Sequence, residues 1–160
     1  MRPTLPAPVL AVLLAALLVA TSAHGEETHR AITFNKHGVS LDLPTGVTAT
    51  ERSGPDFLLY YFTEKKHQVL FAYFGFAPSF PNAAPKNAEV VTETVGGFSA
   101  QSVRWLESDG GHSRESLVRV SNKGGLQFVH FIYTGLNAND SKRVDAIIAS
   151  LRFQPADAGN

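Results

Sequence analysis

The chain has 160 residues, no cysteine, and 14 basic side chains balanced by 14 acidic ones. The balanced charge gives no electrostatic basis for binding nucleic acid or an anionic membrane. Without cysteine there is no disulfide, no thiol catalysis and no thiolate metal site, so burial of apolar side chains must stabilise the fold.

Residues 1–23 have the order of a cleavable secretory signal. A basic residue precedes an apolar run over 9–20, and small residues follow at the positions that favour a cut before His24. The run is shorter than the about 20 residues that a membrane-spanning helix needs. We therefore expect a periplasmic or secreted protein, with one globular domain over 24–160 and no integral membrane segment after cleavage.

The first part of this domain alternates apolar and polar residues. The alternation over 32–34 and 39–43 predicts a half-buried hairpin with a turn at 35–38, and Pro44 ends it. A second turn, with the sequence Ser-Gly-Pro-Asp, is expected at 53–56.

The next segment is the most apolar hairpin of the chain. Residues 57–63 and 69–76 predict two strands joined through 64–67. Three prolines then predict a loop over 77–88, because proline cannot donate to a central strand ladder. Residues 89–95 predict a short strand.

A three-stranded meander and one helix complete the chain. The expected strands of the meander are 98–107, 113–121 and 126–134. An apolar stripe at helical spacing then predicts a C-terminal helix, which Asn139 or Asp140 caps and which ends near Phe153.

These elements predict an α+β fold: a single antiparallel sheet of about seven or eight strands with the C-terminal helix packed on one face. Strands 69–76 and 126–134 are apolar on both faces. The other face therefore needs a further covering layer, or the sheet must curl towards a barrel.

Two short segments carry a resemblance to a known family. Residues 39–46 read VSLDLPTG and follow a strand and a His-Gly turn, and residues 147–153 read IIASLRF. The first resembles the opening of the PsbP-like and DcrB-like exported domains, and the second resembles the helix that closes them. The resemblance implies an α/β sandwich around an antiparallel sheet and an accessory or binding role without catalysis, and it implies no site residues.

The aromatic hairpin is the candidate binding site. Nine of the sixteen aromatic residues lie between Phe57 and Phe80. If Thr63 pairs with Gln68, regular alternation puts one set of rings on a single face, and we predict a protein-docking surface there, with Phe80 beside it. Its residues are Tyr60, Phe71, Tyr73 and Phe80. The alternative is that the 77–88 loop, with Phe80 folded inward, covers this face.

Metal ligation and catalysis receive less support from the sequence. Asp109, His112 and Glu115 surround one hairpin and could offer metal ligands, but a turn tip does not enforce a coordination geometry. His130 is the candidate buried base, and no nucleophile stands near it by spacing. Residues 97–101, Gly-Phe-Ser-Ala-Gln, lack the final glycine of a nucleophile elbow. We therefore expect no catalytic residue, no metal and no cofactor.

The sequence thus predicts an exported, non-enzymatic domain that binds another protein, as an accessory, inhibitor or immunity-type factor of the cell envelope does. One alternative is a carrier that encloses a small apolar ligand in an aromatic-lined cavity. A second alternative is a hydrolase built on His130 or on the His112 hairpin.

Overall fold

The computed structural model describes residues 28–34, 38–120 and 126–153. The expected signal segment and most of the residues in the expected turns at 35–38 and 122–125 lie outside the described residues. The strands are β1 (His29–Phe34), β2 (Val39–Pro44), β3 (Val47–Ser53), β4 (Leu58–Glu64), β5 (His67–Gly75), β6 (Glu89–Val95), β7 (Phe98–Leu106), β8 (His112–Arg119), β9 (Phe128–Leu136) and β10 (Arg152–Phe153), and the helix is α1 (Ala138–Ala149).

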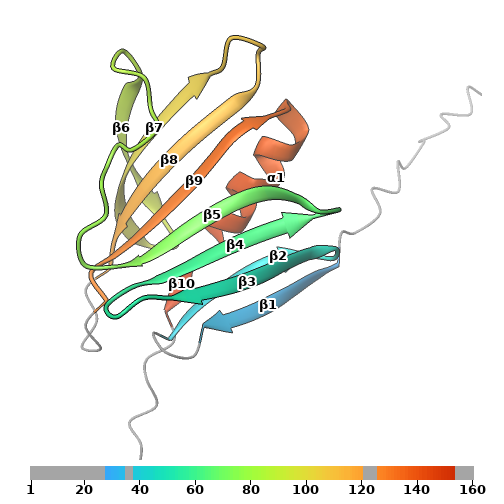
Figure 1. Ribbon diagram of the computed structural model, residues 1–160, viewed down its shortest axis with the longest axis vertical. Helices are drawn as coiled ribbons and strands as arrows, with labels where there is room; N and C mark the ends of the chain where they lie inside the picture. The colour runs from blue at the N-terminus through green and yellow to red at the C-terminus, as the bar shows by residue number, and fades with distance from the viewer. Residues whose placement is uncertain (1–27, 35–37, 121–125, 154–160) are drawn as a thin grey trace, which may run out of the picture.

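Seven of these strands form one large antiparallel sheet, shown in Figure 1, in the order β3-β4-β5-β9-β8-β7-β6. The helix α1 packs on this sheet, against β8 and β9. The predicted α+β fold, with a large antiparallel sheet and a C-terminal helix on one face, is therefore confirmed. No helix within the described ranges is both long and apolar enough to cross a membrane.

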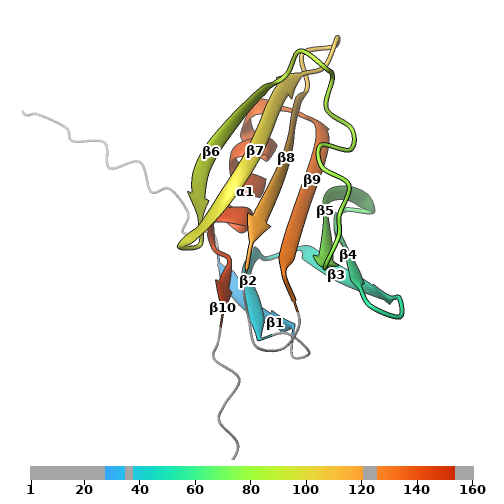
Figure 2. The ribbon, with the colours of Figure 1, turned by 90° about the vertical axis from the view of Figure 1, so that its left-hand side faces the viewer.

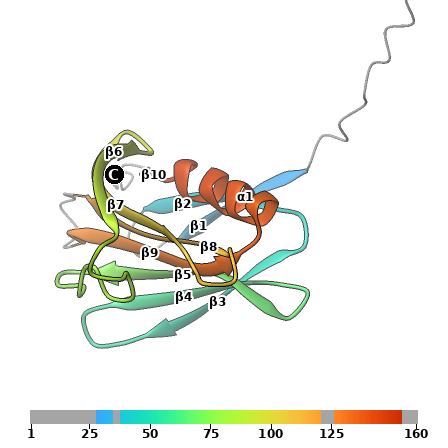
Figure 3. The ribbon, with the colours of Figure 1, turned by 90° about the horizontal axis from the view of Figure 1, so that it is seen from above.

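A second, three-stranded sheet with the order β1-β2-β10 was not expected from the sequence. The segment after the helix pairs with β2, with Arg152 opposite Ser40 and Phe153 opposite Val39. The sequence pattern instead predicts a helix that ends near Phe153. Figure 3 shows this small sheet and α1 together on one side of the large sheet. The small sheet and α1 form the layer that covers this side of the large sheet, which we call its inward face. The opposite side is its outward face.

The hydrophobic core lies between these two layers. Its side chains come from alternate positions of the strands and from one stripe of α1, as the period-two and helical patterns require. The most deeply buried large members are Leu41, Leu43, Phe62, Leu70, Phe74, Leu126, Phe131, Ile148 and Leu151. The apolar stripe predicted for the helix is thus the face that meets the core.

Two local elements differ from the expectation. The sequence pattern predicts no element over 45–52, whereas Val47–Ser53 form β3, whose β-branched residues suit the edge of the large sheet. The helix cap lies two or three residues before the predicted positions, because Asn137 accepts hydrogen bonds from the backbone N–H groups of Asn139 and Asp140, both at 3.0 Å.

Candidate interaction surface

The strand pair β4–β5 contains a β-bulge that divides the predicted site between two faces. Thr63 does pair with Gln68, but Phe62 pairs with Leu70, which leaves Val69 as an extra residue. One extra residue moves every following side chain to the opposite face. Phe71 and Tyr73 therefore point away from α1, whereas Tyr60 points inward. The expectation that these three rings share one face is wrong.

Tyr60 belongs to the hydrophobic core. It is 4% exposed and meets the Phe74 ring edge-on, with the ring centroids 5.0 Å apart. Its hydroxyl donates to Glu51 Oε2 at 2.6 Å. Burial, and then the bond and charge of Glu51, raise the pKa of the Tyr60 phenol above its usual range.

Four other rings form what we call the aromatic face, on the outward side of the large sheet: Phe57, Tyr61, Phe71 and Tyr73. Phe57 stacks on Tyr73 with centroids 5.8 Å apart, and Tyr61 meets Phe71 edge-on at 5.3 Å. All four are half-buried. Their rings remain partly open to solvent.

Two glycines allow the stacked pair to lie flat on the sheet. A Cβ at Gly75 would stand 2.4 Å from the Tyr73 hydroxyl, and a Cβ at Gly54 would stand 2.4 Å from the Phe57 ring. The rings therefore occupy the space that side chains at these positions would fill. This close approach holds the Phe57–Tyr73 pair in one arrangement.

The segment 76–88 between β5 and β6 covers another part of the outward face. Figure 2 shows it on the side of the sheet opposite α1. The buried Glu115 carboxylate accepts the backbone N–H groups of Asn82 at 2.7 Å and Ala84 at 2.9 Å, and that of Ala83 between them. The loop predicted as the alternative therefore covers the outward face over β8 and β9. It does not cover the aromatic face.

Phe80 lies in this segment against His130, edge-on at 5.6 Å, and is half-buried. His130 is 3% exposed, and its Nε2 lies 3.0 Å from Glu115 Oε2. Burial lowers the pKa of His130, against the opposing effect of the Glu115 charge, so the imidazole is neutral at pH 7. A neutral ring with its proton on Nε2 donates to Glu115.

The sequence did not place Glu115 beside His130, because the two residues are brought together only by the pairing of β8 with β9. The pair has the form of a base and an orienting carboxylate. Both groups are nevertheless engaged in holding the 76–88 segment, and the sheet alternation sends Ser116, the nearest hydroxyl on β8, to the other face. The arrangement is suited to anchoring a loop.

The aromatic face has a basic border. The Arg52 guanidinium lies 5.3 Å from the centroid of the Tyr61 ring, and that of Arg119 lies 5.7 Å from the centroid of Phe128. The strand register places no carboxylate at the outward positions of β3, β4, β5 and β9. This part of the outward face therefore combines aromatic rings with positive charge.

The three residues considered as metal ligands do not converge. Asp109 accepts the backbone N–H of Gly111 within the β7–β8 turn, and Glu115 points to the outward face and holds the 76–88 segment. His112 instead lines a groove beside α1. In the part of the chain that the structure describes, no group of three or more His, Asp and Glu side chains could hold a metal ion.

That groove has a volume of about 440 Å³ and runs between α1 and the strands β7 and β8. Trp105 lines it and donates its indole N–H to Glu107 Oε1 at 2.8 Å. The carboxylate of Asp145 accepts from Arg114 at 2.6 Å and from the Tyr133 hydroxyl at 3.1 Å. The Trp105 indole, the Tyr133 hydroxyl and the Asp145 carboxylate of the wall are therefore already hydrogen-bonded.

Arg114 connects the helix to the edge of the large sheet. It is 4% exposed and binds Glu93 on β6 at 2.5 Å as well as Asp145 on α1. Burial by itself raises the pKa of Glu93, but the bond from Ser102 and the charges of Arg114 and Arg104 outweigh it and leave the pKa lowered. Through these two ion pairs, Arg114 on β8 links β6 to α1.

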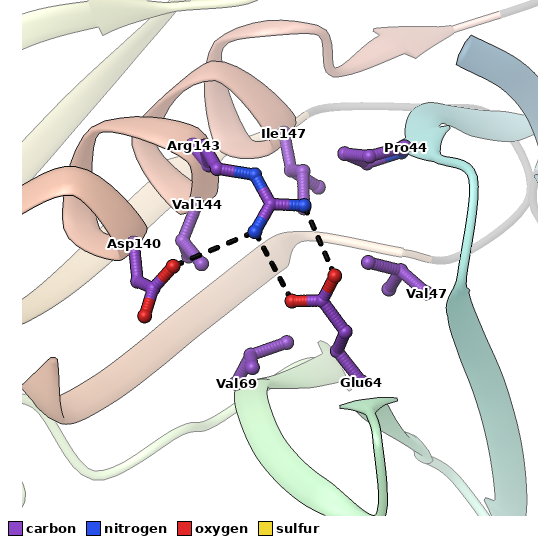
Figure 4. Close-up of a pocket in the computed structure, with 8 residues that line it drawn as sticks. All are labelled: Pro44, Val47, Glu64, Val69, Asp140, Arg143, Val144 and Ile147. Carbon is purple, nitrogen blue, oxygen red and sulfur yellow. Dashed lines mark hydrogen bonds and ion pairs between the residues drawn. The ribbon is translucent and has the colours of Figure 1, made fainter. Parts of the chain in front are cut away.

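A second ion pair links α1 to the aromatic hairpin, as Figure 4 shows. Arg143 donates to both carboxylate oxygens of Glu64, each at 3.1 Å. The bond from Arg143 lowers the pKa of Glu64. The notch between Val69, Val144 and this pair has a volume of about 10 Å³, which is room for no more than one water molecule.

Comparison with known proteins adds little to this description. Neither a protein-family model nor a curated protein matches the chain. Among solved structures, the chain is similar to a crystal structure from Bacteroides thetaiotaomicron VPI-5482, with 14% sequence identity and a TM-score of 0.41. The match covers 73% of this chain and 45% of that one. A TM-score this low does not establish a shared fold or a shared function.

Proposed function

We propose that this chain is an exported, non-catalytic domain that binds another protein through the aromatic face, as an accessory, inhibitor or immunity-type factor of the cell envelope does. The observation that carries the proposal is the group of four half-buried rings, bordered by Arg52, beside strands whose outward positions hold no carboxylate. Aromatic and arginine side chains are the residues that contribute most at protein interfaces.

The charge of this surface indicates the chemistry of the partner. With Arg52 and Arg119 exposed and no carboxylate at the outward positions of the four strands, the complementary surface is apolar with carboxylates around it. The stacked rings and the anchored 76–88 segment are already ordered, so little side-chain entropy is lost on binding.

Two further observations support a binding role over the alternatives. The inward rings of the hairpin pack on one another within the core, where a carrier would need an open cavity between them. His130 and Glu115 are committed to the 76–88 segment, where a hydrolase would need them free to reach substrate. The resemblance of two segments to PsbP-like and DcrB-like domains agrees with a role without catalysis.

The proposal is tested with the double variant Tyr61→Ser, Tyr73→Ser. Immobilised wild-type protein and the variant are exposed to extract of the source cells, and captured proteins are quantified by mass spectrometry. We expect a partner whose dissociation constant, measured with purified proteins, rises at least about tenfold in the variant, since truncating two interface rings costs more than about 1.4 kcal/mol.

Leu106→Ser is the matched control, because Leu106 is 64% exposed and does not belong to the aromatic face. It should keep the partner at wild-type affinity. The melting temperature of the double variant should stay within a few degrees of wild type. A partner that binds the double variant as tightly as wild type, or one that Leu106→Ser loses equally, would contradict the proposal.

A further inference from the structure

The strand β6 forms one edge of the large sheet, and no strand among the described residues pairs with its outer side. Val95 and Phe98 close a two-residue turn in which Gly96 and Gly97 have φ of +57° and +88°. In such a hairpin the closing pair exchanges both backbone hydrogen bonds, and bonded pairs alternate from there. The N–H and C=O groups of Val90, Thr92 and Thr94 therefore point away from β7.

This edge has no bulge, no lysine and no proline, three of the features that usually prevent strands from pairing. Its charged residues are Glu89 and Glu93, and Glu93 is paired with Arg104 and Arg114. Natural edge strands are often short or bulged, or carry proline or charged residues, especially lysine. β6 has seven residues, pairs with β7 without a register shift and contains neither lysine nor proline. Val90 is 54% exposed. At the other edge of the sheet, β3 lies next to β2.

The sequence of β6 is complementary to itself in one antiparallel register. With two copies related by a two-fold axis at Thr92, the threonine faces its own counterpart, and Val90 faces Thr94 of the second copy. Glu93 then faces Val91 of the second copy. Threonine pairs and β-branched pairs across strands are favourable. All seven residues find partners, and no two glutamates are opposite.

The neighbouring registers that keep the open backbone groups paired are unfavourable. A two-fold axis at Val91 places Glu89 opposite Glu93 of the second copy, and an axis at Glu93 places the two Glu93 side chains opposite each other. Like charges directly opposite destabilise a strand pair. From this we infer that β6 is a self-association edge: two copies pair β6 with β6 about Thr92 and join their large sheets into one continuous sheet.

The first test is the mass of the protein in solution, measured by sedimentation equilibrium over a range of concentrations. We expect a reversible dimer in the wild type and a monomer in Thr92→Pro. Proline at this position removes an N–H that points away from β7, so the β6–β7 ladder stays intact. A wild type that remains monomeric at hundreds of micromolar, or a Thr92→Pro dimer of unchanged affinity, overturns the inference.

The second test locates the contact and does not require the proline variant to fold. Because the chain has no cysteine, a single introduced thiol is a unique probe. Thr92→Cys is compared with Ser99→Cys, which lies exposed on the adjacent strand β7. A short linker that joins two thiols should form covalent dimers at least tenfold faster in Thr92→Cys. Equal rates in the two variants overturn the β6 contact.

This inference is independent of the proposed function, because β6 and the aromatic hairpin lie towards opposite edges of the large sheet. Loss of the dimer in Thr92→Pro leaves the aromatic face unchanged.

Discussion

At the scale of single residues, Glu115 determines how the outward face is divided between covered and open surface. Its carboxylate is fully buried and is held by three backbone N–H groups of the 76–88 segment and by His130. Its neighbour Arg114 points to the other face and holds α1. Glu115 thus holds the 76–88 segment on the outward side of the sheet, and the adjacent Arg114 holds α1 on the inward side.

We expect Glu115→Gln to lower the free energy of unfolding by about 2–4 kcal/mol, because the anionic acceptor of a buried network is lost while its donors stay buried. Urea unfolding measures the change. Limited proteolysis should also become faster within 76–88. The exposed Glu89→Gln is the control and should change stability by less than about 0.5 kcal/mol. Unchanged stability in Glu115→Gln would show that the segment is held by other contacts.

At the scale of the elements, the bulge in β5 determines which side chains of the hairpin face outward. The start of α1 determines which side chain of the helix meets the hairpin. The bulge at Val69 turns Phe71 and Tyr73 to the outward face, and the inward residues of the hairpin remain in the core. The cap at Asn137 sets where α1 begins, and with it the position of Arg143 opposite Glu64. The bulge thus decides which rings form the aromatic face, and the cap decides where Arg143 meets the aromatic hairpin.

Asn137→Ala should cost about 1 kcal/mol of stability, because two N–H groups at the helix start lose their acceptor. Asn139→Ala, at a position that the sequence pattern favoured as the cap, should leave stability within about 0.5 kcal/mol of wild type. Urea unfolding of both variants makes the comparison. A larger loss in Asn139→Ala would mean that the helix starts where the sequence pattern put it.

At the scale of the whole molecule, the two layers meet at the end of α1. A Cβ at Gly96, in the β6–β7 turn, would stand 1.9 Å from the backbone oxygen of Leu151. Beside this contact, Phe98 meets Phe153 edge-on at 4.9 Å. The edge hairpin of the large sheet and the return into the small sheet are therefore in direct contact at this point.

Gly96→Ala and its neighbour Gly97→Ala separate this contact from backbone strain. Both glycines have positive φ, so either alanine costs about 1–2 kcal/mol of stability. At Gly97 an added Cβ meets nothing within 4 Å, whereas at Gly96 it meets the backbone of Leu151. We expect Gly96→Ala to lower the melting temperature much further than Gly97→Ala. Equal losses in thermal unfolding would show that the layers can separate there at no cost.

The sequence by itself determined the antiparallel hairpins, the meander, the buried stripe of the helix and the absence of cysteine chemistry, because these follow from residue type and from periods of two and 3.6 residues. It could not locate the bulge at Val69, since any hydrophobic residue near the turn permits either register. For that reason regular alternation groups Tyr60 with Phe71 and Tyr73, although it lies on the other face.

Only the tertiary structure decided which rings are open and which are core, what covers each face, and that Glu115 meets His130. These outcomes depend on strand pairing between residues far apart in the chain. They also depend on where the 76–88 segment lies and on the pairing of β10 with β2. Such contacts are selected by the packing of the whole molecule, and no local pattern of residues encodes them.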